Sequence, residues 1–180
     1  MTRAKLVLLA LAPLLALSPA AAALKVGDQA PDFTTQAALG EQVSAFTLSA
    51  NLKQGPVVLY FYPKAFTPGC TAEAHAFAAR MDEFKALGAQ VIGVSHDDLD
   101  QLKRFGTSEC QSKFAVATDP DQKIMKAYDA VWAERPGLAS RTSYVIAPDG
   151  KILESYTDLK PDQHVTLALN ALKAWKAMQN

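Results

Sequence analysis

The sequence predicts an α/β fold built on a mixed sheet, and three observations support this. Residues 57–62 form a continuous apolar run, opened by Gly55-Pro56 and closed by Pro63, which is typical of a strand covered on both faces. A helix-length segment over 68–87 and a second buried run over 90–94 follow it, so that the three form a βαβ unit. A hairpin pattern near the end of the chain adds antiparallel strands.

The other elements complete this prediction in chain order. Residues 33–48, with Gly40-Glu41 in the middle, predict an N-terminal β-hairpin. After the βαβ unit we expect a helix that carries Leu99, Leu102 and Phe105 and is capped by Asp97 or Asp98. The elements expected after it are a strand over 114–117, a helix starting at Asp119-Pro120-Asp121, strands over 143–146 and 152–156, and a terminal helix over 162–178.

The last two strands are joined by Pro148-Asp149-Gly150, a turn sequence that makes them antiparallel. A parallel unit followed by such a hairpin and a terminal helix resembles a thioredoxin-like sandwich, a mixed central sheet with flanking helices. The pattern by itself fixes only an α/β fold with a mixed sheet.

The first two dozen residues have the layout of a secretory signal peptide. Arg3 and Lys5 form a basic start, residues 6–17 are apolar, and the small residues of 18–23 suit cleavage. The apolar run is too short for a spanning helix, although an uncleaved anchor is the alternative. We expect a signal peptide over 1–23, one domain over 24–180, and export to an oxidising compartment, the bacterial periplasm, without membrane association after cleavage.

Composition limits what the chain can do. Its 18 Lys+Arg and 18 Asp+Glu give a formal net charge of zero, which argues against nucleic acid as a partner. With 49% apolar residues the chain is expected to fold around a core. Two cysteines exclude a disulfide-stapled scaffold and a Cys-rich zinc module, and no metal or cofactor is expected. The patterning demands no partner chain, so we expect a monomer or a weak dimer.

A reactive cysteine is predicted where the first buried strand gives way to a helix, because ligands of open α/β sheets bind at the carboxyl ends of strands. Thr67 can cap this helix and Pro68 can open it, which makes Cys70 the third helical residue. A thiol there feels the positive end of the helix dipole and nearby free N–H groups, which favour the nucleophilic thiolate. An inert, buried cysteine is the alternative that position alone leaves open.

The surroundings of Cys70 resemble the peroxiredoxin signature Pro-x-x-x-Thr/Ser-x-x-Cys, with Pro63 and Thr67 in the matching positions. The longer string over 61–71 is similar to the bacterioferritin comigratory protein, or peroxiredoxin Q, branch of that family. Ala65-Phe66 departs from the branch, where those positions are more often polar. Further similar segments, which together span most of the chain, are Ala30-Pro31-Asp32-Phe33, Asp119-Pro120 with Ala127-Tyr128, and residues 141–150.

The resemblance implies a thiol-dependent peroxidase that reduces hydrogen peroxide and organic hydroperoxides. Cys70 would attack the terminal peroxide oxygen and become a sulfenic acid. Arg141 would stabilise the thiolate and the charge that develops as the O–O bond stretches. Thr67 would hydrogen-bond the peroxide, Pro63 would shield the thiolate from water, and Glu73 would orient Arg141. Without the resemblance, Arg141 is a surface arginine, Pro63 a strand terminator and Glu73 an acid favoured by the helix dipole.

The second cysteine is the candidate resolving residue. Many members of the branch place a resolving cysteine five residues after the first, where this chain has His75. Cys110 is the other thiol, in a polar stretch that we expect to be mobile, and other members resolve from that region. A Cys70–Cys110 disulfide needs local unwinding, because bonded cysteines have Cα atoms within about 7 Å. The alternative is an idle Cys110 and one-cysteine chemistry. A thioredoxin-like or other thiol reductant would then restore Cys70.

Three other functions on the same fold deserve comparison with the peroxidase. An exported thioredoxin-type thiol-disulfide oxidoreductase needs Cys-x-x-Cys, which the chain lacks. A metal chaperone would have to use Cys70 with His75 or His164, a poor donor set for copper or zinc. An inactive thioredoxin-like binding module has no need for a complete signature around Cys70. The sequence therefore favours the peroxidase.

Overall fold

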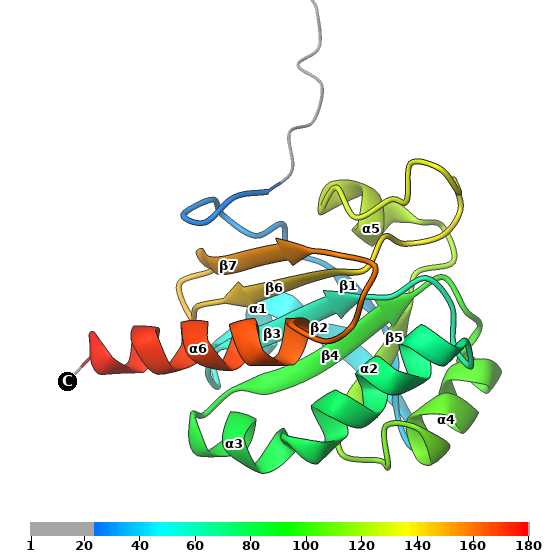
Figure 1. Ribbon diagram of the computed structural model, residues 1–180, viewed down its shortest axis with the longest axis horizontal. Coiled ribbons are helices and arrows are strands. Elements are labelled where there is room, and N and C mark those ends of the chain that lie inside the picture. The colour runs from blue at the N-terminus through cyan, green and yellow to red at the C-terminus, as the bar shows by residue number, and fades with distance from the viewer. Residues whose placement is uncertain (1–23, 180) are drawn as a thin grey trace, which may run out of the picture.

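Seven strands form one mixed sheet in the computed structural model, which describes residues 24–179 (Figure 1). Their order across the sheet is β2-β1-β5-β4-β3-β6-β7. The strands β3 (Val57–Phe61), β4 (Gln90–Ser95) and β5 (Ala115–Thr118) run parallel. On the other side of β3, β6 (Thr142–Ile146) and β7 (Ile152–Thr157) add the antiparallel hairpin. The predicted mixed sheet is confirmed.

The N-terminal hairpin extends the opposite edge of the sheet. Its strands are β1 (Thr34–Leu39) and β2 (Gln42–Thr47), and β1 pairs antiparallel with β5. Gly40 turns the chain with φ 57°, where a Cβ would lie 2.6 Å from the Ser112 Oγ. The predicted hairpin is thus present, and the predicted strand over 114–117 lies one residue later in the chain.

Helices cover both faces of the sheet. One face carries α2 (Pro68–Ala79), α3 (Met81–Ala86), α4 (Leu99–Ser108) and α6 (His164–Ala177), while the short α1 (Leu48–Leu52) and α5 (Lys123–Ala127) lie on the other (Figure 1). Strand β3 is buried throughout, with Val58 and Tyr60 in the first core and the alternating residues in the second. A strand enclosed on both faces is what its continuous apolar run predicts.

Several helices differ from the sequence prediction. The helix expected to start at Asp119-Pro120-Asp121 begins at Lys123, and the Asp119 carboxylate accepts from the N–H groups of Ile124 and Met125. The helix expected over 68–87 is two helices that break at Arg80, whose φ of −108° and ψ of 8° are not helical. This break lets Met81 and Phe84 of α3 join the core that α2 enters with Phe77. The terminal helix begins at His164 rather than Asp162, and α1 was not predicted at all.

No helix in residues 24–179 is long and apolar enough to cross a membrane. The predicted signal peptide over 1–23 lies outside the described residues.

Candidate active site

The site lies in the loop between β3 and α2, at the carboxyl end of a central strand. Cys70 is the third residue of α2, as predicted, and its side chain is buried. Pro68 occupies the first helical position, also as predicted. Thr67 stands at the N-cap with an extended backbone, but its side chain does not cap the helix. Its Oγ1 instead donates to the carbonyl of Lys64 at 2.9 Å, so the predicted side-chain cap is wrong.

Sheet register brings Arg141 to Cys70 from 71 residues away. Arg141 directly precedes β6, and the first residue of β6, Thr142, pairs with Phe61 at the end of β3. The start of one antiparallel strand therefore lies beside the end of its neighbour. The Arg141 Nη2 lies 3.5 Å from the Cys70 Sγ, and its Nε donates to the carbonyl of Leu159 at 2.9 Å.

Glu73 is the second buried partner of Arg141. It follows Cys70 by three residues, so both side chains leave the same face of α2. The Arg141 Nη1 donates to the Glu73 Oε2, and both residues are almost completely buried. Burial raises the pKa of Glu73 to about 8, against the lowering effect of the guanidinium. Cys70, Glu73 and Arg141 are thus brought together as predicted, with one cation between two acidic groups.

Gly69 is a site residue that the sequence analysis missed. A Cβ placed on it would lie 3.0 Å from the Arg141 Nη2. Glycine therefore lets the guanidinium rest against the first turn of α2, within reach of the sulfur. The available signal was a glycine inside a helix, which disfavours the helix and so needs a reason such as close approach.

The active-site loop is fastened to the neighbouring strand at the Ala65-Phe66 departure. The Ala65 N–H donates to the Asp97 Oδ2 at 2.8 Å, and the Ser95 hydroxyl donates to the same oxygen at 2.8 Å. Phe66 adopts a left-handed φ of 63° and packs edge-on against Phe105, with ring centroids 5.3 Å apart. Asp97 thereby holds the loop, which leaves the capping of α4 to Asp98, the other candidate.

A pocket of about 280 Å³ opens beside Arg141. Its walls are mostly apolar and consist of Pro63, Lys64, Thr67, Trp132, Arg135, Leu138, Arg141 and Leu159. Trp132, Arg135 and Leu138 come from the segment between α5 and β6, to which the sequence analysis gave no role. The Arg135 guanidinium lies 4.9 Å from the centre of the Trp132 ring. The predicted residues Pro63 and Thr67 therefore line the same pocket as Arg141.

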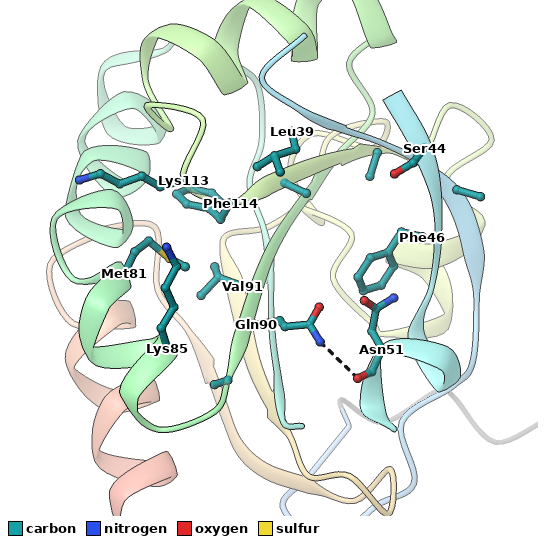
Figure 2. A pocket seen from close by; sticks show the side chains of 14 residues that line it. Leu39, Ser44, Phe46, Asn51, Met81, Lys85, Gln90, Val91, Lys113 and Phe114 are labelled. Atoms are coloured by element: carbon teal, nitrogen blue, oxygen red, sulfur yellow. Dashed lines mark hydrogen bonds between the residues drawn. The ribbon is translucent and has the colours of Figure 1, made fainter. Parts of the chain in front are cut away.

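A second hollow of about 320 Å³ lies away from this site, between the β1–β2 hairpin, α3 and the starts of β4 and β5. Figure 2 shows Lys85 and Lys113 on one side of it and Phe46 and Asn51 on the other. None of the predicted site residues lines it. It therefore does not contribute to the chemistry at Cys70.

Cys110 follows α4 and is fully buried, so the prediction of a polar, mobile setting is wrong for this side chain. Its N–H donates to the carbonyl of Phe105 at 3.1 Å, which turns the residue inward to the core that also contains Cys70. Burial, assisted by Glu109, raises the pKa of the Cys110 thiol far above its usual range. Both cysteines are free thiols.

The residue before Cys110 contacts the helix of Cys70. The Glu109 Oε2 lies 2.7 Å from the Nε2 of His75, which occupies the position expected of a resolving cysteine in the branch. The His75 side chain is about half exposed. Within residues 24–179 no group of three or more His, Cys, Asp or Glu side chains is placed to hold a metal ion.

Comparison with known proteins identifies the class. Residues 26–155 match the AhpC/TSA family. Peroxiredoxin Bcp of Escherichia coli (strain K12) is 36% identical over 156 residues, which cover 83% of this chain and 96% of that protein. The peroxiredoxin Bcp of Bacillus subtilis (strain 168) is 31% identical over the same shares.

Solved structures agree with these sequence relatives. Peroxidoxin BcpB from Mycobacterium tuberculosis has a TM-score of 0.76 at 30% identity, covering 84% of this chain and 97% of that one. Peroxiredoxin Q from Xanthomonas campestris has a TM-score of 0.72 at 28% identity, covering 85% and 97%. The chain belongs to the AhpC/TSA family, as a thiol-dependent peroxidase of the Bcp and peroxiredoxin Q type. The resemblance read from the Cys70 motif is confirmed.

Proposed function

We propose that the chain is a two-cysteine peroxidase in which Cys70 reduces the hydroperoxide and Cys110 resolves the product. The observation that carries this proposal is the 3.5 Å approach of the Arg141 Nη2 to the Cys70 Sγ in the first turn of α2. A buried guanidinium and a helix N-terminus together favour the thiolate at this sulfur. Hydrogen peroxide and organic hydroperoxides are the substrates, and the pocket beside Arg141 accommodates the organic part.

The first step is a displacement at oxygen. The Cys70 thiolate attacks the terminal peroxide oxygen, a S–O bond forms as the O–O bond breaks, and two electrons pass from sulfur to the peroxide. Arg141 donates hydrogen bonds to the charge that develops on the oxygens. The leaving alkoxide or hydroxide takes a proton and departs as alcohol or water. Cys70 is left as a sulfenic acid.

The second step transfers the oxidation to a disulfide. The Cys110 thiolate attacks the Cys70 sulfur and the sulfenic oxygen leaves as water after taking a proton. Because Cys110 is fully buried, the segment that follows α4 has to open before this attack. A thioredoxin-like or other dithiol then reduces the disulfide by exchange, supplying two electrons and two protons.

The test is intact-mass analysis after one equivalent of hydrogen peroxide, with a sulfenate trap present. The wild-type protein is expected to lose two hydrogens and yield a Cys70–Cys110 peptide on non-reducing mapping. Cys110→Ser is expected to hold a trappable sulfenate at Cys70 and to reach the sulfinic acid with excess peroxide. Cys70→Ser is expected to consume no peroxide although it folds.

Two outcomes contradict the proposal at different steps. Peroxide turnover by folded Cys70→Ser removes Cys70 from the chemistry. A persistent sulfenate or a Cys70–Cys70 link in the wild type makes the protein a one-cysteine enzyme.

We also infer that the protein is exported to the bacterial periplasm. The basic residues Arg3 and Lys5, the apolar run and the small residues before Leu24 support a signal peptide over 1–23. The N-terminal sequence of the protein recovered from its native host tests this. Cleavage after Ala22 or Ala23 is expected, and an intact Met1 in the cytosolic fraction contradicts export.

A further inference from the structure

A buried histidine lies behind Glu73, on an element that the reaction described above does not use. His164 is the first residue of α6 and is fully buried. Its Nδ1 lies 2.7 Å from the Ser143 Oγ and 3.8 Å from the Glu73 Oε1, while its Nε2 lies 2.9 Å from the Asp158 carbonyl oxygen. A chain of buried polar groups therefore runs from Cys70 through Arg141 and Glu73 to His164.

The partners of His164 define which nitrogen carries a proton. A carbonyl oxygen can only accept, so the Nε2 facing Asp158 is the protonated nitrogen. Burial lowers the pKa of His164, which favours the neutral ring. In the neutral ring the Nδ1 is an acceptor, and the Ser143 hydroxyl donates to it.

The oxygen of Glu73 that faces this ring has no partner. The Glu73 Oε1 is one of three buried side-chain atoms in residues 24–179 without a hydrogen bond. A fully ionised carboxylate would here leave Oε1 buried without a donor, because the Nδ1 of the neutral ring accepts from the Ser143 hydroxyl and has no proton to offer. One proton held by the pair removes the conflict. On Oε1 it neutralises the carboxylate, and on Nδ1 it turns the Ser143 Oγ into an acceptor and brings a cationic ring to 3.8 Å from Oε1.

Building on the peroxidase function proposed above, we propose that His164 is a positioning residue that holds this proton together with Glu73. While the pair holds the proton, its net charge is zero. The guanidinium of Arg141 then faces one anion, the Cys70 thiolate, instead of dividing its attraction between two. His164 thus promotes thiolate formation without touching the sulfur.

The other charged and titratable groups around Glu73 and His164 do not compete for this proton. Arg141 and Cys70 face it from the active-site side, and Tyr60 faces it from β3 with a pKa that burial raises. Tyr156 packs edge-on against the His164 ring at 4.8 Å, and burial raises its pKa as well. The carboxylate of Asp158 accepts from the Lys160 N–H at 2.8 Å and from the Tyr156 hydroxyl.

The test measures the alkylation rate of Cys70 against pH, in a Cys110→Ser background so that one thiol reacts. This readout uses no peroxide, so it is independent of whether the proposed peroxidase function holds. In His164→Gln the side-chain amide can still donate to the Asp158 carbonyl but holds no titratable Nδ1. We expect its alkylation curve to move to higher pH by about half a unit to one unit, which is about threefold to tenfold slower alkylation at low pH.

A second variant separates charge from structure. In Glu73→Gln the side chain is permanently neutral, so it mimics the protonated acid. The midpoint of Cys70 alkylation in this variant is expected at the wild-type pH or lower. Adding His164→Gln to Glu73→Gln is then expected to cause no further shift. The matched control is His96→Gln, because His96 is an exposed histidine at the end of β4 and its loss is expected to leave the curve unchanged.

Two results overturn the proposal: an unmoved curve in His164→Gln, or a shift that persists undiminished in the Glu73→Gln background. If His164→Gln does not fold, nitrogen-15 NMR of the intact protein decides. The His164 Nδ1 resonance is then expected to titrate with a midpoint near that of Glu73, and to lose this step in Glu73→Gln. An Nδ1 resonance that stays flat from pH 6 to about 9 contradicts the shared proton.

Discussion

Cys70 and Cys110 are both buried free thiols in the same core, yet they have opposite electrostatic surroundings. Cys70 lies in the first turn of α2, and Arg141 donates to its sulfur. Cys110 follows the C-terminal end of α4, beside the carboxylate of Glu109, and burial raises its thiol pKa. A helix attracts negative charge at its N-terminus and repels it at its C-terminus. Burial therefore leaves a thiol inert unless a cation and a helix N-terminus compensate it.

Under the two-cysteine mechanism proposed above, this contrast assigns the two cysteines to different states of the protein. In the folded state Arg141 and the first turn of α2 face the Cys70 sulfur, and Arg141 also lines the neighbouring pocket. Cys110 becomes a nucleophile only after its segment opens to water, which removes the burial that suppresses its thiolate. In this proposal, local opening places disulfide formation after the oxidation of Cys70.

Removing the cation from Cys70 is expected to have the largest effect. Arg141→Gln should make the two thiols electrostatically alike, so peroxide reduction should fall by about 10²–10³-fold. The alkylation curve of Cys70 should also move to higher pH, because the positive charge that favours the thiolate is gone. Arg141→Lys should recover only part of the rate, since an ammonium cannot donate to sulfur and Glu73 in one planar fork. Stopped-flow kinetics and alkylation against pH measure both effects, and coincident curves would remove Arg141 from the mechanism.

Crowding the Arg141 guanidinium is expected to lower the rate of peroxide reduction less than removing it. A Cβ on Gly69 would lie 3.0 Å from the Arg141 Nη2, so Gly69→Ala should displace the guanidinium by a few tenths of an ångström. We expect peroxide reduction to fall about tenfold, because hydrogen bonds to developing charge depend strongly on position. Gly106→Ala is the matched control, since a Cβ there makes only ordinary contacts, the nearest with Val116 at 3.4 Å. Equal rates in both variants contradict the close-approach role of Gly69.

The sequence could predict the parts of the fold and site whose signals are local. The buried run of β3, the turn at Pro148-Asp149-Gly150 and the helix start at Pro68 each carry their own pattern. Arg141 was found through the resemblance, and its position is explained only by the pairing of Thr142 with Phe61. A partner 71 residues away cannot be located without the sheet register.

The parts that could not be predicted depend on tertiary packing. The polar residues around Cys110 suggested that it is exposed. The end of α4 turns the Cys110 side chain inward, and a single inward side chain produces no periodic pattern in the sequence. Arg80 contains no helix-breaking group, so the division between α2 and α3 had no local signal. Trp132 gained a role only because its loop folds over the pocket beside Arg141.

Shortening the pocket wall beside Arg141 is expected to affect bulky hydroperoxides more than hydrogen peroxide. Trp132→Ala should slow the reduction of cumene hydroperoxide about tenfold, since lost apolar contact with a bulky tail costs about 1–3 kcal/mol. Hydrogen peroxide has no tail, so its rate should change far less. Leu39→Ala in the hollow of Figure 2 is the control and should alter neither rate. A parallel loss for both substrates in Trp132→Ala would mean that the tryptophan supports the site rather than the tail.

Removing the contact between His75 and Glu109, next to Cys110, is expected to have the smallest effect. It should raise a rate, whereas the other changes lower one. His75 lies on α2 and its Nε2 lies 2.7 Å from the Glu109 Oε2, next to Cys110. This contact holds the segment that opens in the proposed mechanism, so its loss should speed disulfide formation after sulfenic acid formation. The pair is partly exposed and exposed pairs contribute about 0.2–1 kcal/mol, so His75→Ala should resolve about 1.4- to 5-fold faster. Stopped-flow tryptophan fluorescence separates the two steps, and the peroxide-dependent first step should keep its wild-type rate. Slower resolution in His75→Ala would instead mean that the contact guides Cys110 toward Cys70.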